Sequence, residues 1–208
     1  MGQRLIGITG GIASGKSTVA SYLAKHHLLP ILDADIYSRN ALYQVEDQVL
    51  TRYSTKVVTY INHEPALDRQ KLGEIIFQDS TERAWLENLL HPLVRKCFES
   101  ELQRLADQPI LALVIPLLLE VGWQDLVTET WLIYCPPAIQ LRRLIQRNRL
   151  TLEAAQLRLA CQWPIDQKLC LVDRVIDNSI ELDSQGYNWQ ALYHQVDRAL
   201  LLTHDSIP

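Results

Sequence analysis

The chain has 208 residues, of which 48% are hydrophobic and 21% are charged. This composition supports a full hydrophobic core and excludes an intrinsically disordered protein, and the length suits one α/β domain with small inserted subdomains. The net charge of −4 argues against a general nucleic-acid or membrane surface, although an acidic protein can still concentrate its cations in one cleft.

The first predicted elements are a strand, a glycine-containing loop and a helix, in that order. Residues 4–9 form a short apolar run typical of a buried strand, and residues 18–25 place apolar side chains at helical spacing. Residues 10–17 between them read GGIASGKS and fit G-x-x-x-x-G-K-[ST], the pattern of a phosphate-binding P-loop. The flanking strand and helix favour this interpretation over a glycine-rich turn with an exposed lysine.

The chemistry of a P-loop explains this spacing. Glycines let the backbone turn sharply, so that successive N–H groups form a nest for phosphate oxygens at the positive end of a helix. Lys16 is expected to reach the β- and γ-phosphates of a nucleotide, and the hydroxyl of Ser17 is expected to bind Mg²⁺.

A second predicted strand, residues 29–32, is followed by Asp33 and Asp35. Ligands of open α/β sheets bind beyond the carboxyl ends of the strands, so both carboxylates are candidates for the site. Beside a triphosphate they could hold Mg²⁺ through water or accept a proton from an attacking hydroxyl. The alternative is that one of them only caps the next helix; with the P-loop present, we favour a catalytic role for Asp35.

The third predicted strand covers residues 110–115. The segment that connects the second strand to it is too long for a single crossover. Helical patterns cover most of it, at residues 35–50, 71–78 and 81–106. We therefore predict a mostly helical insertion with a turn near residues 62–65. His91, inside this insertion, is expected to be structural, with ligand contact as the alternative. Glu120 lies at the carboxyl end of the third strand, where it could equally face the cleft or the surface.

Two further predicted strands, residues 129–135 and 174–176, flank a second insertion. The helix predicted at residues 138–149 carries four arginines, at positions 142, 143, 147 and 149. Arg143 and Arg147 are spaced so that one helical face can present both guanidinium groups to phosphate oxygens, the alternative being a solvated charged face. A residue of the N-cap type at position 151 starts a second helix to about residue 162, and this arrangement is typical of a mobile lid over nucleotide phosphates.

Alternating apolar strands and amphipathic helices predict an α/β fold with a mostly parallel sheet. Five tryptophans show no stacking pattern and are interpreted as core or interface residues, at positions 85, 123, 131, 163 and 189. The four cysteines form no C-x-x-C pair, and without a signal peptide they are expected to be reduced thiols of a cytosolic protein. The longest apolar run, residues 110–121, is too short to span a bilayer. We expect a cytoplasmic monomer or weak homo-oligomer without membrane or nucleic-acid partners.

Several of these segments together resemble the dephospho-coenzyme A kinase family. The matching segments run in family order from residue 6 to residue 178. They are ITGGI at 8–12, SGKSTVA at 14–20, LDAD at 32–35, LDR at 67–69, LE at 86–87, HP at 91–92, PLLLE at 116–120, QLRR at 140–143, Arg147, Gln162, Asp173 and VIDN at 175–178. The P-loop alone is generic to nucleotide-binding proteins, whereas the combination of D-A-D, LDR, HP, PLLxE and IDN is specific.

The resemblance implies an enzyme that transfers the ATP γ-phosphoryl group to the ribose 3′-hydroxyl of dephospho-CoA, with Mg²⁺, in the last step of CoA biosynthesis. It also implies a P-loop fold with a five-stranded parallel sheet flanked by helices, a helical substrate-binding insertion and a helical lid, as in nucleoside-monophosphate kinases. On this pattern one kinase domain spans residues 1–208. Its core covers about 1–36, 107–137 and 171–208, the substrate-binding insertion about 37–106, and the lid about 138–170.

Roles for individual residues follow from the same resemblance. The catalytic residues would be Thr9, Lys16, Asp35 and Arg143, with Asp35 as the base for the 3′-hydroxyl and Arg143 stabilising the transferring phosphate. ATP would be bound by Gly11, Ile12, Ala13, Ser14, Gly15, Lys16, Ser17, Thr18, Arg147 and Asn178, with Ser17 on the metal and Asn178 in the adenine pocket. Dephospho-CoA would contact Asp33, His91, Leu117 and Glu120.

Some positions depart from the family's pattern. Ala13 stands where a glycine is usual inside the loop, and alanine is tolerable there if its φ angle is negative. Tyr53-Ser54 stands where Phe-Gly is common, residues 64–66 replace a usual glycine turn, and Val172 replaces a usual alanine. These departures concern local turn shape and substrate affinity, and they leave the lysine, serine, aspartate and arginine of the expected site unchanged.

Other functions compete with this one. A nucleoside or nucleotide kinase on the same scaffold cannot be separated without the resemblance, because substrate choice depends on the helical insertion. A regulatory GTPase is disfavoured because the guanine-reading N-K-x-D motif is absent and the arginines lie in a lid rather than in a partner. A nucleotide-binding protein that has lost catalysis is disfavoured because Lys16, Ser17, Asp35 and Arg143 are all present.

Overall fold

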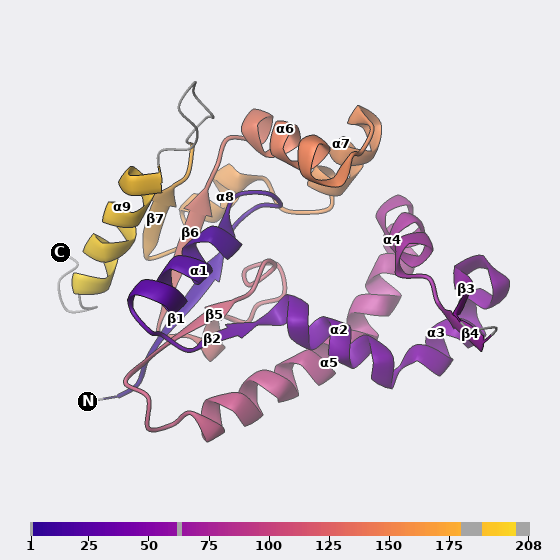
Figure 1. The fold of residues 1–208 in the computed structure, drawn as a ribbon, viewed down its shortest axis with the longest axis horizontal. Coiled ribbons are helices and arrows are strands. Elements are labelled where there is room, and N and C mark those ends of the chain that lie inside the picture. Colours follow the sequence, from indigo (N-terminus) through magenta and orange to yellow (C-terminus); the bar gives the residue numbers. More distant parts are fainter. Residues whose placement is uncertain (1, 62–63, 180–188, 203–208) are drawn as a thin grey trace. The chain divides into compact units, whose positions relative to one another are not determined.

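The computed structural model describes residues 2–61, 64–179 and 189–202 and divides the chain into two compact units (Figure 1). One unit consists of Met1–Asp33 and Ala106–Pro208, and the other of Ala34–Leu105. Within the described part of the chain, no helix has both the length and the apolar character needed to cross a membrane.

The first unit is built on a five-stranded sheet. Its strands, in spatial order, are β2 (Ile31–Asp33), β5 (Ile110–Val114), β1 (Arg4–Thr9), β6 (Glu129–Tyr134) and β7 (Arg174–Asp177). All four pairings are parallel, with Ile6 opposite Ala112 on one side and Glu129 on the other. The five-stranded parallel sheet expected from the sequence is therefore confirmed.

One face of the sheet is covered by α1 (Lys16–His26) and α9 (Trp189–Leu201), which pack against each other (Figure 1). Alternate strand residues point to this side, as the period of a β-strand requires. The fully buried side chains of this core include Ile6, Ile8, Val19, Leu23, Trp131, Ile133, Leu192 and Val196. On the opposite face a Cβ atom at Gly7 would lie 3.0 Å from Leu118 Cδ2 and from Val127 Cγ1, so the segment between β5 and β6 covers that side closely.

A buried ion-pair network lies at the end of the sheet where strands β1 and β6 begin. The carboxylate of Glu129 pairs with Arg4 at 2.5 Å and with Arg174 at 3.0 Å, and its side chain is only 2% exposed. Burial raises the pKa of Glu129, but the hydrogen bonds from the two arginines outweigh burial and hold the pKa below its ordinary value. Both arginines also donate to the carbonyl oxygen of Leu202 just beyond α9, so the network fastens the last helix to the sheet.

Between β6 and β7 lie three helices: α6 (Pro137–Asn148), α7 (Leu152–Ala160) and α8 (Ile165–Leu169). The break between α6 and α7 falls at Arg149, which adopts φ 52°, and α7 begins at the predicted N-cap, where Thr151 Oγ1 accepts from the backbone N–H of Ala154 at 3.2 Å. These two helices are confirmed. The sequence did not predict α8, which is too short to show a helical period.

The second unit consists mainly of helices, with one short antiparallel strand pair. Its elements are α2 (Ala34–Gln44), α3 (Glu46–Tyr53), η1 (Ser54–Val57), β3 (Val58–Ile61), β4 (Glu64–Leu67), α4 (Arg69–Gln78) and α5 (Ser80–Arg104). Side chains from the helices surround Leu72 and Val49 in its hydrophobic core. Asp68 and Asp79 cap α4 and α5 by accepting backbone N–H groups, which explains where these two helices begin.

Two features of this unit differ from the sequence-based expectation. The helix predicted at residues 35–50 is divided at Val45, and the antiparallel pair β3–β4 was not predicted. The predicted turn at residues 62–65 falls partly outside the described residues, since 62 and 63 are not described. Ser54, at the position where the sequence analysis noted that glycine is common, adopts φ 49°, a left-handed value that favours glycine. The functional division into an insertion at about 37–106 and a lid at about 138–170 stays a prediction.

Candidate functional site: the P-loop and its cavity

The P-loop, residues 10–17, joins the end of β1 to the start of α1, and its shape requires glycine at two positions. Gly10 has φ 149°, and a Cβ atom there would lie 2.6 Å from the carbonyl oxygen of Ile133. Gly15 has φ 102° and precedes the first residue of α1; a Cβ atom there would lie 2.1 Å from Nδ2 of Asn178. Neither position can therefore accept a side chain without displacing the backbone or the neighbour.

Ala13 does not meet the condition under which the sequence analysis considered it tolerable. Its φ angle is 58°, in the left-handed region, instead of negative. A left-handed conformation brings Cβ close to the following carbonyl oxygen and costs about 1–2 kcal/mol for a residue other than glycine. The loop thus holds Ala13 under strain, which indicates that the surrounding contacts impose this backbone shape.

Lys16 lies inside the curve of the loop. Its Nζ donates to the carbonyl oxygens of Gly10 at 2.8 Å and Gly11 at 2.9 Å. The ammonium group is therefore held next to the N-terminus of α1, where backbone N–H groups and the helix dipole favour an anion. A phosphate oxygen bound at this helix end could take the place of these carbonyl acceptors, because it is also a hydrogen-bond acceptor and carries negative charge.

Three amide side chains from outside the loop lie against it, and two of them form hydrogen bonds with its backbone. Asn178, fully buried after β7, donates Nδ2 to the carbonyl oxygen of Ser14 at 2.7 Å. Gln162, beyond α7, accepts from the backbone N–H of Ile12 at 2.7 Å. Gln140 of α6 donates to the carbonyl oxygen of Cys135 at 2.6 Å and lies so close to Gly11 that a Cβ atom there would be 2.5 Å from its Oε1. The sequence singled out Gln162 only through the family pattern, and none of the three was predicted as an anchor of the loop.

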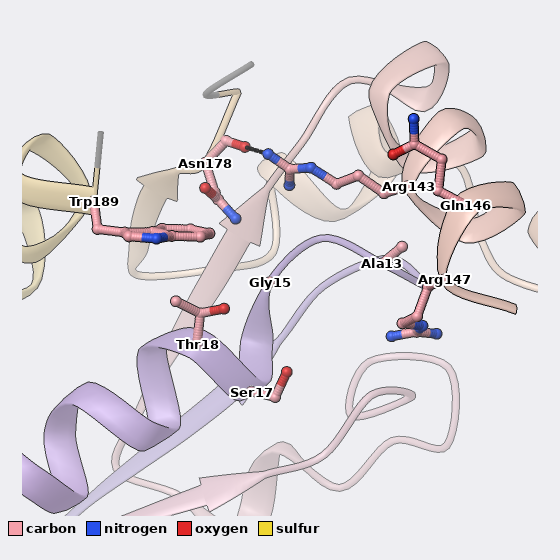
Figure 2. A pocket seen from close by; sticks show the side chains of 9 residues that line it. All are labelled: Ala13, Gly15, Ser17, Thr18, Arg143, Gln146, Arg147, Asn178 and Trp189. Carbon is pink, nitrogen blue, oxygen red and sulfur yellow. Dashed lines mark hydrogen bonds between the residues drawn. The ribbon is translucent and has the colours of Figure 1, made fainter. Parts of the chain in front are cut away.

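A cavity of about 420 Å³ opens beside the P-loop (Figure 2). Its walls come from the loop, from α6 and from the start of α9. It is lined by Ala13, Gly15, Ser17, Thr18, Arg143, Gln146, Arg147, Asn178 and Trp189. The structure thus brings together seven of the residues predicted to act on ATP, and it adds Gln146 and Trp189, which the sequence analysis did not predict there. Trp189 had been assigned to the core or an interface; it packs against the core and also lines this cavity.

The two arginines predicted to share one face of a helix both line the cavity. The Nη2 group of Arg143 donates a hydrogen bond to the carbonyl oxygen of Asn178 at 3.1 Å. Its Nη1 atom lies 3.5 Å from Sγ of Cys135. Burial raises the pKa of the Cys135 thiol, an effect that the nearby guanidinium group opposes. Arg147 donates Nε to Oδ1 of Asn148 at 2.9 Å. Arg143 is therefore positioned by the residue that follows β7, while Arg147 is oriented by its neighbour in α6.

Other predicted residues of this unit have structural partners. Thr9 is fully buried and donates Oγ1 to the carbonyl oxygen of Pro116 at 3.1 Å. Glu120 forms an ion pair at 2.5 Å with Lys168 of α8, a lysine with no exposed side-chain surface. The same Oε1 atom of Glu120 accepts from the backbone N–H of Trp163 at 3.3 Å. Leu117 is half-buried in the turn after β5. Catalysis by Thr9 and substrate contact by Leu117 and Glu120 stay predictions.

Asp33 and Asp35 flank the point at which the chain passes from the first unit to the second. Asp33 is the last residue of β2 and lies opposite Val114 in the register of the sheet. Asp35 is exposed in the first turn of α2, and His91 lies within α5 of the same unit. Burial lowers the pKa of His91, and Glu87 opposes that effect, so the imidazole is held in its neutral form near pH 7. The roles predicted for these residues stay predictions.

Comparison with known proteins adds the family. A sequence model of the family described as dephospho-CoA kinase matches residues 4–184. A dephospho-CoA kinase of Trichormus variabilis is 49% identical over 203 residues, which cover 96% of this chain and 98% of that protein. Among solved structures, TT1252 from Thermus thermophilus has a TM-score of 0.76 at 32% identity and covers 98% of this chain and 100% of its own. Dephospho-CoA kinase from Campylobacter jejuni has a TM-score of 0.65 at 28% identity and covers 95% of each chain.

The matched region spans the P-loop and every residue that lines the cavity except Trp189. This chain belongs to the dephospho-CoA kinase family.

Proposed function

We propose that this protein transfers the γ-phosphoryl group of ATP to the ribose 3′-hydroxyl of dephospho-CoA, giving CoA and ADP. The observation that carries the proposal is the cavity at the P-loop, where Lys16 and two arginines flank the N-terminus of α1 in a chain of this family. The fold alone would not carry it, because one P-loop scaffold serves many phosphoryl acceptors.

The triphosphate would bind along the P-loop. Backbone N–H groups at the start of α1 supply donors and the positive end of the helix dipole. Lys16 would exchange its two carbonyl acceptors for phosphate oxygens, and Arg143 and Arg147 would approach from the α6 side of the cavity (Figure 2). Four sources of positive potential thus meet where negative charge spreads over the transferring group, which is the arrangement that lowers the barrier of phosphoryl transfer.

The residues present fit a magnesium ion carried with the nucleotide. The part of the chain that the structure describes contains no group of three or more His, Cys, Asp or Glu side chains arranged to hold a metal ion. Mg²⁺ in kinases needs few protein ligands, because phosphate oxygens and water supply most of its octahedral shell. Ser17, which lines the cavity, would supply a hydroxyl ligand, and Asp33 or Asp35 a water-mediated one. The ion would neutralise charge on the phosphates.

In the transfer itself, the 3′-hydroxyl oxygen forms a bond to the γ-phosphorus while the bond from that phosphorus to the bridging oxygen of ADP breaks. Asp35 would accept the hydroxyl proton, and Arg143 would stabilise the equatorial oxygens of the transferring group. Asp35 follows the carboxyl end of β2 in the chain, which is the end of the sheet where the P-loop also begins. Asp35 is an exposed residue in the first turn of α2.

The experiment is ADP release with MgATP and a panel of acceptors: dephospho-CoA, adenosine, AMP, CMP and shikimate. Release that depends on dephospho-CoA, with a product bearing a 3′-phosphate, is the expected result. ADP release that depends on another acceptor would show that dephospho-CoA is not the substrate. No ADP release with any acceptor, despite nucleotide binding, would contradict the kinase proposal.

Variants then assign the residues. Lys16→Ala and Arg143→Ala should each lower kcat by roughly 10²–10³-fold, the scale for one lost electrostatic contact in the transition state. Asp35→Asn should depress transfer and spare ATP binding, whereas Asp47→Asn, an exposed carboxylate in the first turn of α3, should change neither. Loss of ATP binding in Asp35→Asn would make this residue structural or metal-linked instead. The cytoplasmic location and the monomer or weak homo-oligomer expected from the sequence stay predictions.

A further inference from the structure

Trp189 joins the hydrophobic core to the P-loop cavity. It is the first residue of α9, is partly buried, and packs against the core formed by α1, α9 and the sheet. Figure 2 shows its indole ring extending into the space above Thr18, with Asn178 on the other side. Among the nine residues that line the cavity, it is the one aromatic side chain.

The cavity has two chemically different parts. Gly15, Ser17, Arg143 and Arg147 supply backbone donors, a hydroxyl and two cations, all of which suit phosphate. Trp189 supplies a flat apolar face that can neither pair with phosphate nor be hydrated well. A nucleotide has the same division, with charged phosphates at one end and a flat heterocyclic base at the other.

A second observation lies beside the indole ring. Oδ1 of Asn178 is buried and has no hydrogen-bond partner among the residues that the structure describes, while Nδ2 of the same amide is committed to Ser14. In Figure 2 the side-chain amide of Asn178 lies next to the indole ring, with its nitrogen toward the P-loop. An unpartnered buried carbonyl oxygen is unfavourable, so a ligand that brings an N–H donor to this place would be stabilised.

We propose that Trp189 is the stacking platform for the base of ATP and thereby sets nucleotide affinity. This inference rests on the proposed function, and it adds a base contact that the family's sequence pattern does not assign to position 189. Stacking of a base on an aromatic side chain is worth enough to change affinity by roughly tenfold to hundredfold. The phosphate contacts at the other end of the cavity do not depend on it.

The test separates the base from the phosphates. Binding of MgATP and of inorganic tripolyphosphate is measured by calorimetry for the wild-type protein, Trp189→Ala, Trp189→Phe and Trp163→Phe. Trp163 is the matched control, an exposed tryptophan of the same unit outside this cavity. Trp189→Ala should weaken MgATP binding roughly 10–100-fold and leave tripolyphosphate binding unchanged, whereas Trp189→Phe keeps an aromatic face and should lose only a few-fold.

Tryptophan fluorescence gives an independent measurement that does not depend on the alanine variant folding. MgATP should quench the emission of the wild-type protein and of Trp163→Phe, and the quenching should be absent in Trp189→Phe. In kinetics, Trp189→Ala should raise KM for ATP with little change in kcat, as expected for a contact made equally in the ground and transition states.

Equal MgATP affinity in Trp189→Ala and wild type, or undiminished quenching in Trp189→Phe, would overturn the inference. A parallel loss of tripolyphosphate affinity would overturn it as well, because Trp189 would then act by supporting the P-loop. These results are distinguishable from failure of the proposed reaction, because the binding measurements need no phosphoryl acceptor.

Discussion

The side-chain amide of Asn178 donates to the carbonyl oxygen of Ser14 at 2.7 Å and so ties the end of β7 to the middle of the P-loop. The same nitrogen lies 2.1 Å from the position that a Cβ atom at Gly15 would take, and the backbone carbonyl oxygen of Asn178 accepts from Arg143. One buried residue therefore positions both the phosphate-binding loop and a cation of the cavity. The functional site depends on this contact between segments that lie far apart in the sequence.

Gly15→Ala should weaken MgATP binding by at least tenfold. A methyl group there must either displace Asn178 or distort the loop, and φ 102° is unfavourable for alanine in any surroundings. Gly73→Ala in α4 is the matched control, because its Cβ atom would meet nothing closer than Phe77 at 3.8 Å. The control should leave binding unchanged and raise thermal stability slightly, since alanine favours a helix. Wild-type affinity in Gly15→Ala would mean that the loop adapts without strain.

Ala13→Gly should stabilise the protein by about 0.5–1 kcal/mol, because glycine removes the left-handed strain at φ 58° while adding freedom to the unfolded chain. The measurement is Tm by calorimetry, where 1 kcal/mol corresponds to about 2–4 °C for a chain of this size. Ala20→Gly, a buried helical alanine in α1, should instead lower stability by about 1 kcal/mol or more. A fall in Tm for Ala13→Gly would show that the left-handed conformation is not strained.

Glu120 and Lys168 should show strong energetic coupling. The lysine side chain is fully buried, so removing its partner leaves a buried charge unpaired and costs about 3–5 kcal/mol. In a cycle of Glu120→Leu, Lys168→Met and the double variant, we expect the double variant to unfold at a higher urea concentration than Glu120→Leu.

Kinetics on the same variants test the role that the sequence predicts for Glu120. If the double variant is stable and has a normal KM for dephospho-CoA, Glu120 acts only by holding α8. A raised KM at normal stability would establish the substrate contact. Additive single effects on stability would argue that the ion pair contributes nothing beyond its separate groups.

Glu129→Gln should lower stability by about 3 kcal/mol near pH 7, because Arg4 and Arg174 lose the buried carboxylate between them. The pKa of Glu129 in the folded protein lies below its ordinary value of 4.5, so the stabilisation is complete above pH 4.5 and is lost as pH falls through the folded pKa. The difference in Tm between wild type and variant should therefore be constant from pH 8 to pH 5 and shrink below that.

Glu101→Gln provides the control for this pH dependence. Glu101 forms an exposed ion pair with Arg104 within α5. Removing the charge of Glu101 should leave Tm nearly unchanged, because water screens such pairs. If the Tm difference for Glu129→Gln did not shrink in acid, the network would stabilise the fold by packing rather than by charge.

Much of the fold could be predicted because its signals are local. The five strands are short apolar runs, and Thr151 marks the start of α7 with its own side chain. The antiparallel pair β3–β4 was missed because its strands are short and lie among helical patterns. The left-handed angles of Ala13 and Ser54 were not predicted, because alanine and serine themselves favour a negative φ; the glycine usual at both positions in the family was the available signal.

The sequence by itself determined that this chain has a P-loop between a buried strand and a helix, because glycines, Lys16 and Ser17 at fixed spacing leave few other interpretations. Only the tertiary structure decided which distant residues complete that site. Asn178, Gln162 and Trp189 reach the loop from β7, from the segment after α7 and from α9, and no periodicity in the sequence records which segments the packed sheet and helices bring side by side.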